Sequence, residues 1–387
     1  MNTLIQNLHS ITPKDFLSRS LKGDYPIVFW KEPYAETRQL IVQLSNKIER
    51  ISPEIECMKP GFIINSFKSS HPSKPYFVKS DIHYKWNDLE YNISINPSVS
   101  SGYLDDYLSY HKKTREFLPK LDSFKGANFC SSAEKAIDLL KKNKMKKVVL
   151  SFFEDHTLPV DFDPVLKFEI LCRQYPNAFI YLLYSSITGL WMGATPENLL
   201  TVADNKFSTV ALAGTQTIEK NQSIEGVAWK QKEIEEQAMV SRYIIDCFKK
   251  IRLREFEEIG PRTVRAANLA HLSTSFHVDM LATNTPELGS VMLDLLHPTS
   301  AVCGMPREQA LDFIHKHEHY ERKLFTGYLG PVNIRNKTAI FVNLRCAELN
   351  DTRIRFYAGA GITNKSSPKD EETEIQQKLK TLKNILL

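Results

Sequence analysis

The stretch GYLGPVNIRNKTAIFVNLRCAELNDTRIRFYAGAGI, residues 327–362, decides the fold. It contains three apolar segments, separated by turn-forming residues at Arg335-Asn336-Lys337 and at Asn350-Asp351. Segments of this kind predict strands, and strands joined by short turns must pair antiparallel because the turn reverses the chain. This part of the chain is therefore predicted to form an antiparallel sheet.

The same pattern continues toward the N-terminus. AFIYLLYSSITGLWMGAT (178–195) and ENLLTVADNKFSTVALAGT (197–215) each predict a hairpin, the second turning at Asp204-Asn205. Helices are predicted for 131–145, 163–176 and roughly 229–254, with a strand at KKVVLSFF (146–153). Strands grouped in hairpins and helices in blocks favour an α+β fold with antiparallel sheets over a parallel βαβ design.

The first third of the chain is less legible. GFIINSF (61–67) and YFVKSDIHYKW (76–86) predict strands on either side of a surface loop, and residues 109–124 predict a helix or a connector. We expect one domain over residues 1–387, with residues 1–120 as the N-terminal part of the same fold.

Composition excludes several classes of protein. The 387 residues are 42% hydrophobic and 25% charged, and the formal net charge is only +5. The basic residues are dispersed, so we expect no nucleic-acid partner. The six cysteines lack C-x-x-C spacing, the first residues do not resemble a secretion signal, and no apolar run approaches the ~20 residues of a membrane span. A cytoplasmic protein without membrane contact is expected.

Two residues are candidates for acid–base chemistry. Lys147 opens the strand after the basic helix end KKNKMKK, where a solvated lysine is the ordinary interpretation. A lysine stem in apolar surroundings can instead have its pKa lowered from ~10.4 to ~7–8, which suits a base. Glu197 follows a Thr-Pro turn in GATPENLL. It is either a turn carboxylate or, beside the apolar run, an acid kept protonated by burial.

Two acidic pairs predict a metal site. Glu233 and Glu236 share one face of a helix, and Glu371 and Glu374 repeat this spacing. Each pair alone is common on exposed helices, but together they offer the oxygen ligands that Mg²⁺ prefers. The small-residue turn expected at Gly359-Ala360-Gly361 would give amide groups for a second anion, so the ligand would carry two carboxylates or phosphates.

Arg345 and His271 leave two interpretations open. Arg345 alternates with apolar neighbours in a predicted strand, so it needs either a carboxylate ligand or a structural glutamate. His271 in NLAHLSTSF is compatible with a core histidine bonded to backbone. The Gly-Ala-Gly stretch is no dinucleotide fingerprint, because Asn364 replaces the third glycine.

Nine motifs in one order resemble the chorismate-utilising enzymes, and among these most resemble isochorismate synthases of the menaquinone or siderophore type. They are KVVLS, GATPENLL, ALAGTQ, KEIEEQAMV, HLSTSF, HPTSAVCGMPREQA, GYLGPV, NLRCAEL and YAGAGITNKSSPKDEE. The resemblance covers residues 125–387, the expected catalytic region. It implies two large antiparallel sheets packed as a sandwich with helices outside.

The resemblance also implies roles. Lys147 would activate water to attack C2 of chorismate, and Glu197 would protonate the departing C4 hydroxyl. Glu236 and Glu374 would bind Mg²⁺ directly, and Glu233 and Glu371 through water. The remaining substrate-binding positions would be Gly214, Thr215, His271, Ala301, Arg345, Gly361 and Lys378.

Two positions distinguish members of the family. A lysine at position 147 implies water as nucleophile, whereas relatives that use ammonia typically have glutamine there; no obligatory glutaminase subunit is therefore expected. Relatives that expel pyruvate to give salicylate tend to have threonine where this chain has Ala301. The leading hypothesis is an isomerase that forms isochorismate. Its alternatives are a salicylate synthase, an ammonia-using anthranilate or aminodeoxychorismate synthase component, and a non-catalytic binding protein.

Overall fold

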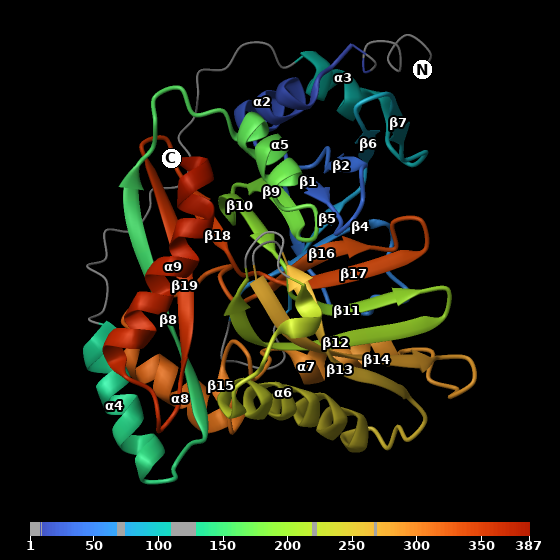
Figure 1. Cartoon of the computed structure of the whole chain (residues 1–387). Helices are drawn as coiled ribbons and strands as arrows, with labels where there is room; N and C mark the ends of the chain where they lie inside the picture. The colour runs from blue at the N-terminus through green and yellow to red at the C-terminus, as the bar shows by residue number, and fades with distance from the viewer. Residues whose placement is uncertain (1–7, 9, 68–73, 110–128, 219–222, 267–268) are drawn as a thin grey trace.

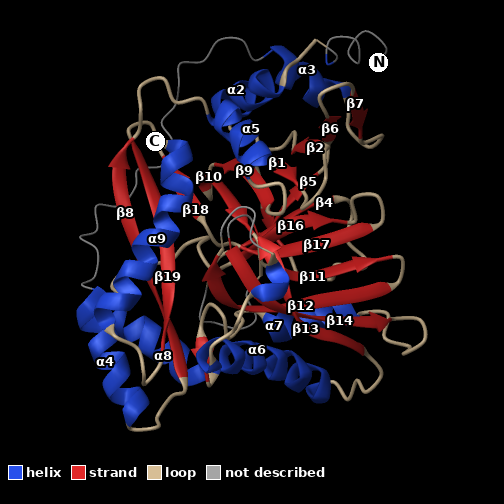
Figure 2. Cartoon of the chain, viewed as in Figure 1, coloured by secondary structure: helices blue, strands red, loops and turns tan. Residues whose placement is uncertain are grey.

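Two large antiparallel sheets lie face to face, and helices cover their outer faces (Figure 1 and Figure 2). The structure is a computed structural model, which describes residues 8, 10–67, 74–109, 129–218, 223–266 and 269–387. The predicted α+β sandwich is confirmed. The loop predicted at 67–77 and the connector predicted at 109–124 lie largely outside the described residues.

The first sheet has ten strands within the described ranges. In spatial order they are β15 (Gly304–Met305), β8 (Lys147–Thr157), β19 (Arg353–Ile362), β18 (Cys346–Leu349), β10 (Gly189–Thr195), β9 (Phe179–Ser185), β1 (Ile27–Lys31), β2 (Arg38–Val42), β6 (Ile82–Trp86) and β7 (Tyr91–Ile95). The strand predicted at 146–153 extends to Thr157 because β8 pairs with β19 along nearly its whole length.

The second sheet has nine strands in the same described part of the chain. In spatial order they are β13 (Glu257–Ala266), β14 (Leu269–Asp279), β12 (Lys206–Thr217), β11 (Asn198–Ala203), β17 (Lys337–Val342), β16 (Tyr328–Val332), β4 (Gly61–Asn65), β5 (Tyr76–Lys79) and β3 (Glu49–Arg50). Asp204 and Asn205 form the predicted β11–β12 turn with positive φ angles of 50° and 58°. Asn and Asp tolerate this left-handed conformation better than most residues.

The helices divide between the two sheets. They are α2 (Pro13–Gly23), α3 (Ser101–Ser109), α4 (Phe129–Lys141), α5 (Pro164–Gln174), α6 (Gln231–Lys250), α7 (Leu288–Leu296), α8 (Arg307–His317) and α9 (Pro368–Leu386), with a 3₁₀ turn at Ile224–Gly226. Helices α4, α5, α8 and α9 pack on the ten-stranded sheet, whereas α6 and α7 pack on the nine-stranded sheet. No described helix is both long and apolar enough to cross a membrane.

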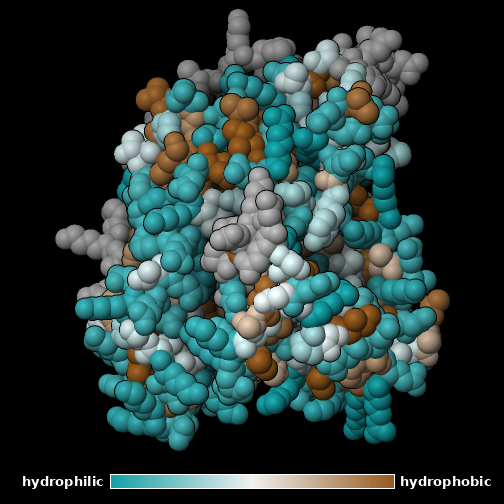
Figure 3. All heavy atoms as spheres, in the orientation of Figure 1, coloured by the Kyte–Doolittle hydropathy of each residue, from teal (hydrophilic) through white to brown (hydrophobic). Residues whose placement is uncertain are grey.

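Three apolar clusters fill the layers. One lies between the ten-stranded sheet and its helices, one between the nine-stranded sheet and α6 and α7, and one between the two sheets. Strand β1 shows how alternation builds them, because Phe29 faces the helices while Trp30 faces the other sheet. The face of the molecule drawn in Figure 3 is mainly hydrophilic, with an apolar area near α5.

The N-terminal third contributes strands to both sheets. Strands β1, β2, β6 and β7 lie in the ten-stranded sheet, and β3, β4 and β5 lie in the nine-stranded sheet. Their weak signal in the sequence has a physical reason. Strand β1, which was not predicted from the sequence, is buried along its whole length, so it lacks the polar–apolar alternation that identifies a half-exposed strand.

Two of the places where the chain passes from one sheet to the other are neighbours. One passage, at Pro196 and Glu197, leads from β10 to β11, and the other, at residues 343–345, leads from β17 to β18. Strand β10 pairs with β18, and β11 pairs with β17, so the passages lie side by side. The Thr195 hydroxyl donates to the Val342 carbonyl over 2.5 Å and ties them together.

Two predictions about residues 327–362 are wrong. The stretch forms four strands, not three, because the chain changes sheets between β17 and β18; Arg345 therefore lies outside any strand, with a φ of 47°. Gly359-Ala360-Gly361 is not a turn but the end of β19, paired with β8.

Candidate active site

Lys147 is held at the first position of β8. Its side chain is only 6% exposed, and its Nζ donates to Glu236 Oε1 over 2.7 Å. A Cβ at Gly361, on the adjacent strand β19, would lie 2.8 Å from Lys147 Cε. Glycine at 361 therefore makes room for the lysine side chain, which explains one of the small residues in this stretch. The solvated lysine is the neighbouring Lys146, which is exposed.

Glu197 lies at the passage from β10 to β11. Its amide donates to Thr195 Oγ1 over 3.4 Å, and its carbonyl accepts from Val342 N over 3.0 Å. Burial raises the pKa of its carboxyl to about 7, although Lys147, Lys378 and Arg345 act to lower it. Glu197 is thus a carboxyl poised to give a proton near neutrality, within electrostatic reach of Lys147.

Glu233 and Glu371 lie in the first turns of α6 and α9, where the helix dipole stabilises negative charge, and Glu236 and Glu374 follow one turn later. The helix starts lie close together, since Lys232 Nζ is 3.9 Å from Glu371 Oε1. Glu371 is buried, and burial raises the pKa of its carboxyl; Ser366 donates to it over 2.7 Å. Glu233 Oε2 is buried with no hydrogen-bond partner among the described residues.

Lys378 connects the second acidic pair with β19. Its Nζ donates to Glu374 Oε1 over 2.7 Å and to the Gly359 carbonyl over 2.9 Å. Its charge also acts on the carboxyls of Glu197 and Glu236. The lysine is therefore central to the charge balance of the site.

Arg345 is a cation that its surroundings leave available. No hydrogen bond or ion pair of its guanidinium is found within the described chain, and burial lowers its pKa. Of the two interpretations left open by the sequence, a structural glutamate in contact with Arg345 is not found among the described residues. Glu197 acts on it only at longer range.

His271 and Gly214 meet on neighbouring strands. The His271 ring is buried and its Nδ1 donates to the Gly214 carbonyl over 3.0 Å, while burial lowers its pKa to about 4. Gly214, with a φ of 70°, forms an irregularity in β12, and a Cβ there would lie 3.0 Å from Glu233 Cβ. Thr215 pairs with His271 in the strand register, but its side chain lies outside the described part of the chain.

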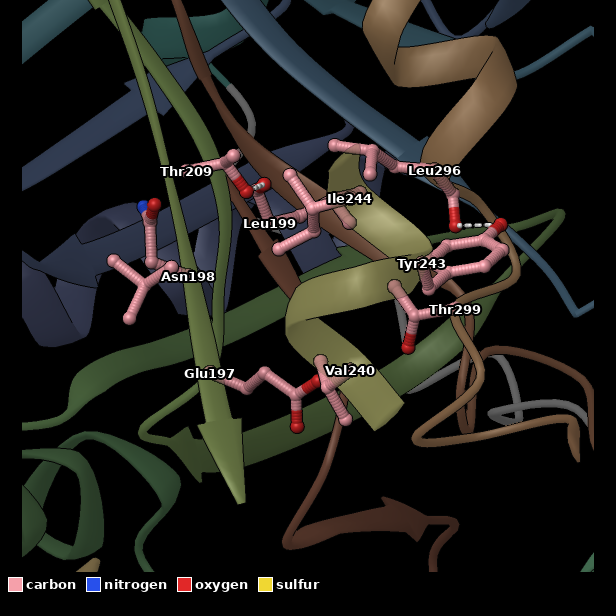
Figure 4. A pocket seen from close by; sticks show the side chains of 10 residues that line it. Glu197, Asn198, Leu199, Thr209, Val240, Tyr243, Ile244, Leu296 and Thr299 are labelled. Atoms are coloured by element: carbon pink, nitrogen blue, oxygen red, sulfur yellow. Dashed lines mark hydrogen bonds between the residues drawn. The ribbon is translucent and has the colours of Figure 1, made fainter. Parts of the chain in front are cut away.

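A pocket beside Glu197 contains residues that the sequence did not single out. It lies between β11, β12, α6 and the segment that follows α7, and it is lined by Leu199, Thr209, Val240, Tyr243, Ile244, Leu296 and Thr299 as well as Glu197, Asn198 and Val210. In Figure 4 the Glu197 carboxylate lies beside Val240, and the Thr299 hydroxyl enters the same space.

Thr299 is the most informative of the missed residues. Its hydroxyl and that of Ser300 are buried without hydrogen-bond partners in the described structure. Both belong to HPTSAVCG, where the sequence had directed attention only to Ala301, which is partly buried next to them. The signal was present in the motif, because two hydroxyl residues precede the small apolar one.

The structure brings the predicted residues to one region but does not assemble a ready metal centre. Lys147 pairs with Glu236, and Lys378 pairs with Glu374. Within the described ranges, no three His, Cys, Asp or Glu side chains are grouped so that they could hold a metal ion. The arrangement places an amine, Lys147, within electrostatic reach of the Glu197 carboxyl and leaves Arg345 available for an anion.

Comparison with known proteins indicates a family. Residues 93–387 match the model of a family described as chorismate binding enzyme. The isochorismate synthase EntC of Escherichia coli K12 is 28% identical over 276 residues, which is 70% of this chain and 68% of EntC.

Solved structures agree on the fold. The menaquinone-specific isochorismate synthase MenF of Escherichia coli superposes with a TM-score of 0.76 at 20% identity, covering 98% of this chain and 92% of MenF. Anthranilate synthase component I of Streptococcus pneumoniae gives 0.65 at 18% identity, covering 93% and 92%. These likenesses include the N-terminal third, where the sequence motifs are absent.

The pKa of Glu197 predicts a pH-dependent stability difference. Between its ordinary value of 4.5 and about 7, the folded protein keeps a proton that the unfolded chain loses. Wild-type stability should therefore fall as pH rises through this window, and Glu197→Gln should remove that fall. At about 1.4 kcal/mol per pKa unit, the variant should gain roughly 1–3 kcal/mol over wild type between pH 5 and pH 8.

Urea unfolding at both pH values measures this difference. Glu235→Gln, at an exposed position of α6, is the control and should follow wild type. An unchanged pH dependence in Glu197→Gln would mean that this carboxyl titrates normally.

Proposed function

Because the chain belongs to the chorismate binding enzymes, we propose that it is an isochorismate synthase, an isomerase that converts chorismate to isochorismate. The relatives named above support the choice within the family. One observation carries the proposal. A buried lysine amine and a partly buried carboxyl with a pKa of about 7 lie within electrostatic reach of each other, beside Arg345, which has no anionic partner in contact within the described residues.

The proposed reaction needs a base and an acid at two carbons of one ring. Lys147 takes a proton from a water molecule as its oxygen bonds to C2. The ring double bonds shift, and the C4 hydroxyl leaves as water with a proton from Glu197. Water is added and water is lost, so the reaction is an isomerisation.

The protonation states change in opposite directions during turnover. Lys147 ends protonated and Glu197 ends ionised, so one proton must return from the lysine to the carboxylate before the next cycle. The pKa of about 7 for Glu197 supports this return, because a strongly acidic carboxyl would not accept the proton. No external acid or base is consumed.

The carboxylates of the substrate need cationic and polar partners. We assign the enolpyruvyl carboxylate to Arg345 and the Gly361 amide, because the Arg345 guanidinium is largely buried and makes no contact with a described carboxylate. His271, Gly214, Thr215 and Ala301 are assigned to the ring. A neutral His271, whose pKa lies near 4, offers a hydrogen-bonding group without adding charge. Lys378 would offset the second acidic pair.

Mg²⁺ is proposed as the cofactor. The four carboxylates at the starts of α6 and α9 provide the oxygen donors that this ion prefers, and the buried Glu233 Oε2 has no other described partner. Glu236 and Glu374 would bind it directly, with Glu233 and Glu371 acting through water. A bound Mg²⁺ would act as a Lewis acid on the ring carboxylate. Glu236 and Glu374 each form an ion pair with a lysine in this structure. The same carboxylates would therefore contact both a lysine ammonium and Mg²⁺.

Water is the proposed nucleophile, and no glutaminase subunit is required to supply ammonia. Ala301 lacks the hydroxyl of the threonine that relatives forming salicylate tend to have, which supports a reaction that stops at isochorismate. We also propose a cytoplasmic location, which six free cysteines support.

Product analysis tests the function directly. The purified protein is incubated with chorismate and Mg²⁺, with and without ammonium, and the products are separated by chromatography. Isochorismate should be the main product under both conditions. Salicylate with pyruvate would identify a salicylate synthase, an aminated product would identify an ammonia-using enzyme, and unchanged chorismate would contradict any of these activities.

Removing the proposed base or acid should affect turnover far more than binding. Lys147→Ala and Glu197→Gln should each lower kcat by roughly 10²–10⁴, the usual contribution of general acid–base catalysis. Steady-state kinetics and chorismate binding by calorimetry separate the two effects. Lys146→Ala, which removes the adjacent exposed lysine, is the matched control. Wild-type kcat in Lys147→Ala would refute the base assignment.

The Mg²⁺ requirement should depend on Glu236 and not on the adjacent Glu235. Glu236→Gln should raise the Mg²⁺ concentration for half-maximal rate about tenfold or more, because a charged ligand is replaced by a neutral one. Glu235→Gln, at the adjacent exposed position, should leave it unchanged. Mn²⁺ binding followed by electron paramagnetic resonance measures affinity without reference to activity. Equal affinities in both variants would place the metal elsewhere.

A further inference from the structure

Glu318 and Arg322 form a buried ion pair outside the site described above. Arg322 is 2% exposed and Glu318 is 8% exposed. Two parallel bonds join them, from Arg322 Nε to Glu318 Oε2 over 2.7 Å and from Nη2 to Oε1 over 2.6 Å. The guanidinium also lies 4.3 Å from the centre of the Phe67 ring. A bidentate pair of this kind has a fixed geometry, so it can hold the backbone groups that bond to it in fixed positions.

The pair continues the hydrogen bonding of β8 where a neighbouring strand ends. Strand β15 pairs only with Lys147 and Val148. Beyond it, the Val149 carbonyl accepts from Arg322 Nη2 over 2.7 Å, and the Ser151 amide donates to Glu318 Oε1 over 2.7 Å. Two side chains thus take the place of a strand at the outer edge of β8, just after Lys147.

The same guanidinium holds the segment that carries Thr299 and Ala301. Arg322 Nη1 donates to the Val302 carbonyl over 2.9 Å and to Thr326 Oγ1 over 3.3 Å. Val302 N in turn donates to the Thr299 carbonyl over 3.1 Å. Residues 299–302 lie against the pocket of Glu197 through Thr299. One side chain therefore contacts both the strand of Lys147 and the segment beside Glu197.

We propose that Glu318 and Arg322 are positioning residues, which fix the start of β8 and residues 299–302 so that Lys147 meets the substrate on the side opposite Glu197. The inference rests on the proposed function for its kinetic consequence, but its structural consequence does not. Neither residue contacts the reacting atoms. Their effect passes through Val149, Ser151 and Val302, and an error of about 1 Å in placing a catalytic group can cost about 10² in rate.

The far end of β8 offers a matched control. Arg355 forms two bonds with Asp155, from Nε over 2.6 Å and from Nη2 over 2.8 Å, and lies 4.0 Å from the centre of the Phe153 ring. Arg355 is also 2% exposed. Both arginines are buried, bond to a carboxylate in two places, lie over an aromatic ring and contact β8. Arg322 contacts β8 at Val149, close to Lys147, whereas Arg355 contacts it at Asp155.

Arg322→Lys and Arg355→Lys form the test. A lysine keeps the charge, but its single ammonium cannot serve the acceptors that the planar guanidinium reaches together. Circular dichroism melts check that both variants fold, and all assays are run well below the lower Tm. Arg322→Lys should lower kcat about tenfold or more with the chorismate KM within about threefold. Arg355→Lys should keep kcat within about twofold of wild type.

Hydrogen–deuterium exchange gives a readout without substrate. Exchange of the backbone amides in residues 147–153 should be about tenfold faster in Arg322→Lys than in wild type, and unchanged in Arg355→Lys. If Arg322→Lys does not fold, Glu318→Gln replaces it and should show the same two changes, since it weakens the same bonds. Wild-type kcat and exchange in a folded variant, or equal losses of kcat at both arginines, would overturn the positioning role.

The outcomes separate this inference from the proposed function. If the wild-type protein forms no isochorismate but exchange at 147–153 still changes in Arg322→Lys alone, the positioning role of Arg322 is supported and the proposed function is wrong. If isochorismate is formed and neither exchange nor kcat changes in Arg322→Lys, the proposed function is supported and the positioning role is wrong.

Discussion

The two adjacent passages between the sheets are the constraint on which the rest of the site depends. A residue inside a strand must face one apolar layer or the other, and both layers here are closely filled. Glu197 and Arg345 escape this choice because each lies where the chain leaves one sheet for the other. Because β10 pairs with β18 and β11 pairs with β17, the two passages are adjacent. They bring Glu197 and Arg345 to one place between the sheets, hereafter the seam.

Charge balance decides which groups in this seam are available. Lys147 and Lys378 each have a glutamate in contact, and burial keeps Glu197 protonated up to a pKa of about 7. Arg345 makes no such contact, and one oxygen of Glu233 lacks a described partner. A partly buried cation and a buried acceptor atom that both lack contacts cost free energy unless a ligand supplies those contacts. The site is therefore suited to a ligand that carries negative charge, beside which the proposed Mg²⁺ would bind.

Local signals in the sequence predicted the hairpins and the general class of fold. Asp204-Asn205 specified a turn through its own backbone preference, and this was found. Signals that depend on distant neighbours failed. Arg345 looked like a strand residue because its neighbours are apolar, but they belong to two different sheets. Gly359-Ala360-Gly361 looked like a turn, whereas the glycine at 361 leaves space for a side chain from another strand.

The candidate site divides in the same way. Residue types and spacing indicated the acidic pairs and Lys147, but neither property states which lysine contacts which glutamate. Thr299 was missed because its importance lies in an unpartnered buried hydroxyl, which only packing reveals. The motif resemblance supplied the order of the pieces. The approach of α6 to α9, the passage geometry and the pKa of Glu197 required coordinates.

The placement of Lys147, the proposed base, shows how a strand end can hold an amine in a fixed position. A free lysine side chain has about 2 kcal/mol of rotamer entropy to lose. Here its backbone pairs with Met305 of β15, its stem lies against Gly361 of β19, and its ammonium donates to Glu236. Each restraint comes from a different element, and they converge only if β8 keeps its register. The outer edge of β8 beyond β15 is bonded to side chains and loop backbone, so the precision of the amine depends on those contacts as much as on the sheet.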